Sequence, residues 1–201
     1  FSETAELALE HAKFMAKLHK ADIHLLHGIE SYSFTSAISH AFGKAQTEFE
    51  EKIESSANEK LQQLADTLHH DSGMTVTYST EVGKIYKKIV SMAEEMRVSV
   101  IIMGTHGVSG FQEMLIGSNT YKVVMAAPCP VISVQTHSTK IGFKNIILPI
   151  DNSHTSRQKV KHAIELARHY NSVVHVLGLM TMSDPELQKR FEVKIHQVQG
   201  Y

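Results

Sequence analysis

Apolar positions along the first half of the chain change period from segment to segment, which predicts alternating helices and strands. Residues 2–20 repeat small and apolar side chains at the three- and four-residue spacing of a helix that packs on a sheet. Residues 23–29 form a short apolar strand, and residues 47–70 carry helix formers. Residues 31–43, between them, are predicted as a loop or a broken helix.

The next segments continue this alternation. Residues 74–82 are rich in strand formers, and a helical stripe of apolar residues follows at 85–96. Residues 98–103 are almost wholly apolar and β-branched, which is typical of a parallel strand covered by helices on both faces. A helix from Asn119 to Ala126 and a strand from Val131 to Gln135 follow. The pattern predicts an α/β fold, a doubly wound parallel sheet with right-handed crossovers.

A repeat then sets the domain organisation. Residues 153–177 match residues 2–26 at a constant offset of 151, with seven identities in 25 positions. The second copy is preceded by an apolar strand that ends at Asp151, whose counterpart would lie just before Phe1. We therefore expect a tandem pair: a first domain over 1–137 that lacks its first strand, and the start of a second over 143–201.

This organisation leaves a vacant central position in the first sheet. One hypothesis is that the strand Asn145 to Ile150 occupies it and brings Asp151 towards Gly104. The alternative is that this strand stays within the second copy.

Composition narrows the class of protein. With Lys+Arg 20 against Asp+Glu 21, the chain has no positive field that would hold nucleic acid. A single cysteine, Cys129, allows no internal disulfide, and no apolar run approaches the roughly 18 residues needed to cross a bilayer. The 14 histidines show no metal-ligand spacing. We expect a cytoplasmic protein with no membrane, nucleic-acid or metal site.

The glycine-rich turn after the strand at 98–103 carries the clearest chemistry. Glycines at 104, 107 and 117 let backbone N–H groups approach an anion closely. Ser118 is predicted to cap a helix that begins at Asn119, where free N–H groups favour negative charge. Because ligands of doubly wound sheets bind at the carboxyl ends of the strands, the turn predicts a phosphate site.

A plainer interpretation of the same residues stays open. Gly104 and Gly107 can simply turn the chain, Gly117 can relieve crowding, and His106 is more often solvated than bound to phosphate. No catalytic residue stands out, because the chain has no G-x-x-x-x-G-K-[ST] loop and no candidate in the turn for activating water.

The spacing G-x2-G-x9-G-[S/T] resembles the ATP-binding signature of the universal stress protein family. The segments VSVIIMGTHG, APCPVISVQ and KNIILPIDNS resemble the same family. The resemblance implies a five-stranded sheet in the order 3-2-1-4-5, of the adenine nucleotide alpha hydrolase type. It also implies bound ATP, with or without Mg, and a homodimer or pseudo-dimer formed through the strand Val131 to Gln135.

The resemblance further implies the residues of the site. The phosphates and ribose would bind to the glycine loop and to the start of the next helix. The base would contact Met103 and the strand near Gly28. An aspartate at the end of the first strand would complete the site. The implied set is Met103, Gly104, His106, Gly107, Gly117, Ser118, Asn119, Gly28 and Asp151.

Three functions follow as hypotheses. The leading one is an ATP-binding regulatory protein of the stress response, whose shape or pairing depends on nucleotide and which is not an enzyme. The second is a scaffold that binds no nucleotide and works by dimerisation. The third is slow ATP hydrolysis, for which the second copy lacks the expected Ser-Gly-Gly-rich loop after its first strand.

Overall fold

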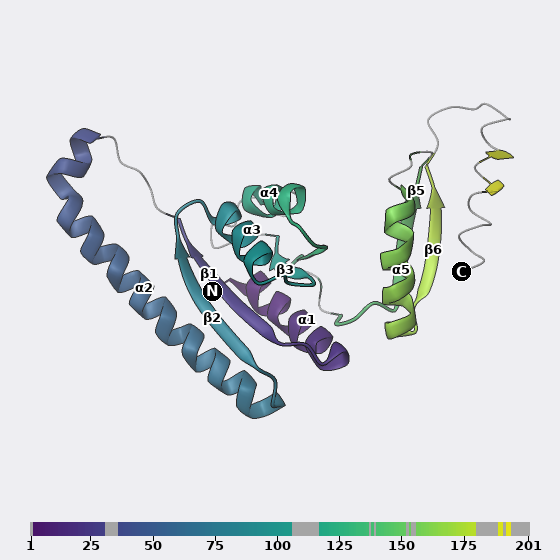
Figure 1. The fold of residues 1–201 in the computed structure, drawn as a ribbon, viewed down its shortest axis with the longest axis horizontal. Coiled ribbons are helices and arrows are strands. Elements are labelled where there is room, and N and C mark those ends of the chain that lie inside the picture. Colours follow the sequence, from purple (N-terminus) through teal and green to yellow (C-terminus); the bar gives the residue numbers. More distant parts are fainter. Residues whose placement is uncertain are drawn as a thin grey trace. The chain divides into compact units, whose positions relative to one another are not determined.

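The computed structural model divides the chain into two compact units, Phe1–Ile141 and Gly142–Tyr201 (Figure 1). It describes residues 2–30, 36–105, 117–136, 138, 140–151, 153, 156–179, 189–190 and 192–193.

The first unit alternates helices and strands as the periodicity predicts. Its elements are α1 (Glu3–His19), β1 (Ile23–Ile29), α2 (Ser36–Ser72), β2 (Val76–Val82), α3 (Ile85–Glu95), β3 (Ile101–Gly104), α4 (Ser118–Ala126) and β4 (Val131–Val134). One prediction is wrong: the loop or broken helix expected over residues 31–43 is helical from Ser36 onward. The residues that follow it favour helix strongly enough for the helix to extend back through this segment.

The strands of the first unit form two parallel pairs. β1 pairs with β2 from Ile23↔Val76 to Ile29↔Val82, and β3 pairs with β4 from Ile101↔Val131 to Gly104↔Val134. Among the described residues, no ladder joins β1 to β3. The α/β fold with parallel strands is confirmed, while the five-stranded sheet in the order 3-2-1-4-5 stays a prediction.

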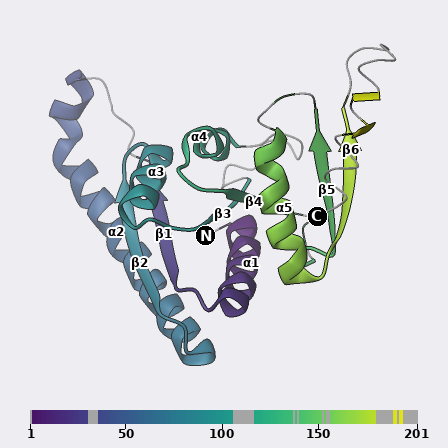
Figure 2. The same cartoon turned by 45° about the vertical axis from the view of Figure 1, so that its right-hand side comes forward.

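Helices cover both faces of the β1–β2 pair. Neighbouring residues of β2 point in opposite directions, and their partners identify the two layers. Ser79 donates through its hydroxyl to the sulfur of Met92 in α3 at 3.5 Å. Thr80 donates to Asn58 in α2 at 3.2 Å. Thus α2 lies on one face and α3 on the other, and α4 packs beside α3 (Figures 1 and 2).

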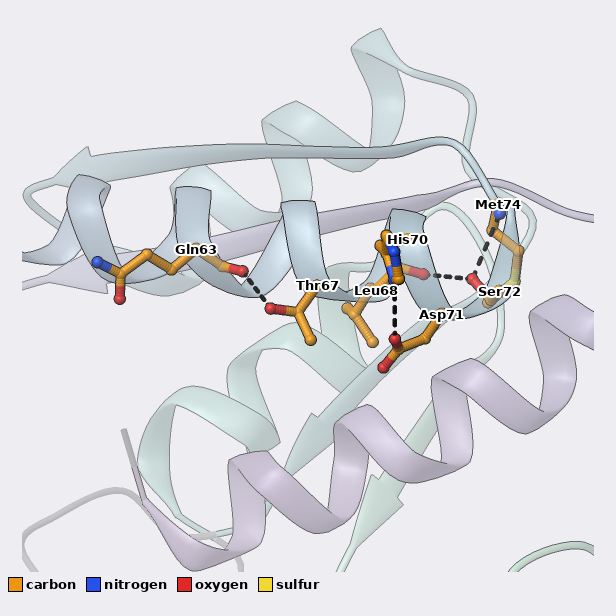
Figure 3. A network of polar contacts seen from close by, with 7 residues as sticks. All are labelled: Gln63, Thr67, Leu68, His70, Asp71, Ser72 and Met74. Atoms are coloured by element: carbon orange, nitrogen blue, oxygen red, sulfur yellow. Dashed lines mark hydrogen bonds and ion pairs between the residues drawn. The ribbon is translucent and has the colours of Figure 1, made fainter.

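Side-chain hydroxyls mark the end of α2 (Figure 3). Ser72 donates to the carbonyl oxygen of Leu68 at 2.5 Å and accepts the N–H of Met74 at 3.3 Å. Thr67 makes the same kind of bond to Gln63, at 2.7 Å. Gly73 then adopts φ +68°, which turns the chain towards β2 at no steric cost.

The second unit contains β5 (Asn145–Ile150), α5 (Ser156–Tyr170) and β6 (Val173–Gly178). β5 and β6 are parallel, and one face of the pair packs on α5 through Leu148, Ile150 and Ala163. Among the described strands, β5 pairs only with β6, in a sheet separate from those of the first unit, so the hypothesis that it fills the first sheet is not borne out. The helices of the described segments include none that is both long and apolar enough to cross a membrane.

Candidate functional site

Backbone and threonine hydrogen bonds join the end of β3 to the start of α4. The N–H of Gly117 donates to the carbonyl oxygen of Thr105 at 2.8 Å. The hydroxyl of Thr120 donates to the carbonyl oxygen of Gly104 at 3.0 Å. Thr105 and Thr120 are only 2% and 3% exposed. A buried polar contact of this kind fixes the helix start against the carboxyl end of the strand.

Gly117 is required by the close approach of two backbones. A Cβ at this position would lie 2.5 Å from the carbonyl oxygen of Thr105, which is well inside van der Waals contact. This approach agrees with the plainer interpretation, in which Gly117 relieves crowding. Any side chain here would push α4 away from β3, so this glycine sets the geometry of the site.

Gly104 and Gly28 are each covered by a neighbouring side chain. A Cβ on Gly104 would lie 2.6 Å from the Oγ1 of Thr4, in the first turn of α1. A Cβ on Gly28 would lie 2.5 Å from the Cγ2 of Ile85, at the start of α3. Both glycines thus let helices pack closely on the strands. Packing accounts for them whether or not a nucleotide binds.

Helix α4 begins one residue earlier than predicted. Gly117 is its N-cap, and the N–H of Tyr121 donates to the Gly117 carbonyl oxygen at 2.9 Å. Ser118 is therefore the first helical residue and not the cap, because the tight Gly117–Thr105 contact already turns the chain into the helix. The N–H groups of Ser118, Asn119 and Thr120 have no carbonyl partner within the helix, as at any helix start.

Glu30 connects the end of β1 to the start of α4. The side-chain amide of Asn119 donates to the Glu30 carboxylate at 2.9 Å, across 89 positions of sequence. Glu30 directly follows Ile29, the last residue of β1. The carboxyl ends of β1 and β3 and the start of α4 therefore meet at one edge, where ligands of such sheets bind.

Asp151 lies in the second unit, at the end of β5. Its Oδ1 accepts from the hydroxyl of Ser153 at 2.5 Å, from the hydroxyl of Ser156, and from the N–H of Ser153 at 2.9 Å. These hydrogen bonds favour the ionised form and hold the pKa of Asp151 well below its usual range. The carboxylate is thus engaged in ordering the start of α5.

The structure brings together part of the predicted site. The edge where β3 ends and α4 begins holds Gly104, Gly117, Ser118 and Asn119, together with Met103, which is half-buried on β3. His106 and Gly107 lie outside the described residues, and Asp151 belongs to the other unit. Sequence reasoning missed four residues of this edge. They are Thr4, Glu30, Thr105 and Thr120.

One signal in the sequence points to two of the missed residues. Glu30 and Thr105 each directly follow a strand, the position at which parallel sheets place ligand-binding side chains. Thr4 and Thr120 had no such signal, because both face backbone that is distant in sequence. Within the described segments, no group of His, Cys, Asp and Glu side chains could hold a metal ion.

Known proteins match this chain along most of its length. The model of the universal stress protein family matches residues 1–135. The universal stress protein MJ0577 of Methanocaldococcus jannaschii is 31% identical over 146 residues, which cover 67% of this chain and 90% of the relative. YxiE of Bacillus subtilis, also a universal stress protein, is 29% identical and covers 67% of this chain and 93% of its own.

Solved structures of universal stress proteins are similar to this chain as well. The structure of MJ0577 has a TM-score of 0.57 at 34% identity, covering 67% of this chain and 89% of that one. A universal stress protein from Archaeoglobus fulgidus covers 100% of this chain and 72% of its own, with a TM-score of 0.70 at 20% identity, a likeness of fold alone. By family model, identity and fold together, this chain belongs to the universal stress protein family.

Proposed function

We propose that the first unit binds ATP where the ends of β1 and β3 meet the start of α4, and that the protein is a nucleotide-responsive regulator of the stress response. One observation carries this proposal. The start of α4 is held at the carboxyl end of β3 by the bonds of Gly117 and Thr120. Family membership supports it, because the glycine spacing resembles the family's ATP signature.

The start of α4 suits phosphate by its chemistry. The N–H of Gly117 is already bonded to Thr105, which leaves the N–H groups of Ser118, Asn119 and Thr120 as donors. The helix dipole adds a partial positive charge at the same point. In this proposal Gly104, His106 and Gly107 complete the phosphate loop, with Mg as an optional companion of the nucleotide.

The remaining assignments extend the proposal. Met103 and the strand near Gly28 would receive the adenine, and Asp151 would serve the corresponding place in the second copy. Two chains, or two copies, would pair through β4. No catalytic residue is assigned, so ATP would act by occupancy and not by rapid turnover.

The direct test is to denature the purified chain and identify the released small molecules by mass spectrometry, followed by calorimetric titration of emptied protein with ATP. Near-stoichiometric release, or saturable binding below millimolar ATP, is the expected result. Phosphate release measured alongside would detect slow hydrolysis. Absence of both release and binding would refute the proposal.

Ser118 offers a sharper variant than Gly117, whose substitution would collide with Thr105. Ser118 is exposed at the first helical position. Ser118→Asp should leave α4 intact, because acidic residues are favoured in the first turn, yet repel phosphate. We expect ATP to bind at least about tenfold more weakly, with a smaller loss for the control Ser118→Ala. Equal affinity of Ser118→Asp and wild type would mean that phosphate binds elsewhere.

A scaffold without nucleotide is the second candidate. It is favoured by Gly104 and Gly28, because Thr4 and Ile85 already explain why neither position carries a side chain. In that case the chain releases no nucleotide, and its function rests on contacts between copies. The titration described above separates the two candidates.

A further inference from the structure

A carboxylate lies beside the proposed phosphate position. Glu30 accepts a hydrogen bond of 2.9 Å from the side chain of Asn119, the second residue of α4. Glu30 is exposed and follows the last residue of β1, so its side chain crosses from the strand end to the helix start. Among the described residues, a carboxylate therefore contacts the side chain of Asn119 at this helix start.

The same physical chemistry that favours phosphate here favours Glu30. The first turn of a helix carries partial positive charge, and an acidic side chain near it is stabilised. A bound phosphate would occupy the same field and would meet a like charge within a few ångströms. Because Coulomb repulsion grows with the charge of the ligand, Glu30 would oppose a triphosphate more than a monophosphate.

We infer that Glu30 is a specificity-determining residue of the nucleotide site: it holds the anion position at the start of α4 and discriminates against nucleotides of higher phosphate charge. This inference rests on the proposed function. Phosphates must displace the carboxylate from Asn119, so the site binds each nucleotide less tightly than an uncharged residue at position 30 would allow. The penalty increases from AMP through ADP to ATP.

A purely structural role for Glu30 makes a different prediction. If the bond to Asn119 only ties β1 to α4, then a neutral side chain of the same shape serves equally well. Glutamine retains an oxygen that can accept from Asn119, while it removes the charge. Glu30→Gln thus separates the effect of charge from the effect of the hydrogen bond.

The experiment measures the Kd of AMP, ADP and ATP for wild type and Glu30→Gln by calorimetry, at low salt and with Mg removed by chelator. We expect Glu30→Gln to bind ATP about two- to fivefold more tightly, with a smaller gain for ADP and the smallest for AMP. The gain should shrink at high salt, because exposed charges are screened.

Asp71→Asn is the matched control, since it removes the same net charge. Asp71 is exposed at the end of α2, beside the start of β2 and thus at the opposite end of the β1–β2 pair from Glu30. We expect it to leave all three affinities unchanged. An equal gain for Asp71→Asn would assign the effect to overall charge and overturn the inference.

The remaining outcomes are distinct. If wild type and Glu30→Gln bind ATP equally, or if Glu30→Gln binds it more weakly, the discriminating role is refuted while the proposed ATP site stands. If neither protein binds any of the three nucleotides, the proposed function fails and the inference fails with it.

Discussion

Helix α1 of the first unit and helix α5 of the second end with the same turn of the backbone. Lys20 and Asn171 both adopt left-handed conformations, with φ of 53° and 50°. The next N–H in each copy donates to a carbonyl oxygen five residues earlier. These bonds run from Ala21 to Ala16 at 3.0 Å and from Ser172 to Ala167 at 2.9 Å. The residues of each pair are related by the offset of 151, and the two-copy organisation itself stays a prediction.

The two helices differ in the face that they bury. Ala8 and His11 of α1 are 5% and 6% exposed. Their counterparts in α5 are Lys159, which is exposed, and His162, whose side chain is 58% exposed. Helix α1 packs on β3, whereas the described part of the second unit has only β5 and β6. The comparison shows that neighbouring strands decide which face of the same helix becomes core.

The starts of the two helices differ as well. In α1 the hydroxyl of Ser2 accepts from the N–H of Ala5 at 3.3 Å. In α5 the residue at the position of Ala5 is Ser156, whose hydroxyl donates to Asp151. The second copy therefore holds its aspartate with a serine that the first copy lacks. Sequence similarity between the copies does not extend to this contact.

Among substitutions that give one copy the residue of the other, the one at Ala8 should change the free energy of unfolding most. Ala8→Lys places a charged side chain in the packed space under α1, and we expect it to lower the free energy of unfolding by roughly 3 kcal/mol or more. The reciprocal change, Lys159→Ala, acts on an exposed site and should stay within about 0.5 kcal/mol. Urea unfolding followed by circular dichroism compares the two variants.

Hydrogen exchange locates the effect within the chain. Ala8→Lys should increase exchange in α1 and β3, and leave α5 unchanged. If Ala8→Lys and Lys159→Ala lower the free energy of unfolding by similar amounts, α5 buries the corresponding face too. The difference in burial between α1 and α5 would then be wrong.

Local pattern was sufficient for most of the fold. The strand predicted over residues 23–29 matches β1 residue for residue, because a short apolar run between polar segments leaves little choice. The start of α2 was missed, since helix-neutral residues at 36–43 become helical only as the continuation of a longer helix. Local pattern does not show that no described ladder joins β1 to β3, and only the repeat, which predicts a vacant central position in the first sheet, bears on it.

The site was predictable only in part. Glycine spacing located Gly104 and Gly117, because tight turns restrict which residues fit. The contacts that hold them, from Thr4 and Thr120, join segments far apart in sequence and leave no periodic trace. The bond between Glu30 and Asn119 is of the same kind, and it depends on how β1 and α4 meet in space.

A smaller effect is expected from Ser156→Ala, which gives the second copy the residue found at Ala5 in the first. Ser156 is 2% exposed, and loss of its hydrogen bond to Asp151 should lower the free energy of unfolding at neutral pH, by less than Ala8→Lys does. The serine bonds lower the pKa of Asp151 in the folded state, so their contribution is present above the unfolded value of about 4.

That contribution is lost as the pH falls through the lowered folded pKa of Asp151, so the difference between wild type and Ser156→Ala should narrow in strong acid. Thermal unfolding at a series of pH values tests this expectation. Ser153→Ala is a useful companion, because it removes another hydroxyl that donates to the same carboxylate. A difference that stays constant at all pH values would mean that Ser156 stabilises α5 without Asp151.

The smallest effect concerns His24, which corresponds to His175 of the second copy. His24 places its two ring nitrogens 2.8 Å from the Thr77 hydroxyl and 3.0 Å from the Ser79 hydroxyl, and burial lowers its pKa. Because the folded pKa lies below the unfolded value of about 6.5, the unfolded state binds more protons between the two values. The contribution of neutral His24 to stability is therefore present above about pH 6.5 and declines as the pH falls towards the folded pKa.

NMR titration of the ring protons, assigned with His24→Gln, should give a midpoint below 6.5, and the variant should lose this part of the pH dependence of unfolding. A midpoint at or above 6.5 would show that the hydroxyls of β2 support the charged ring, which would reverse the predicted sign.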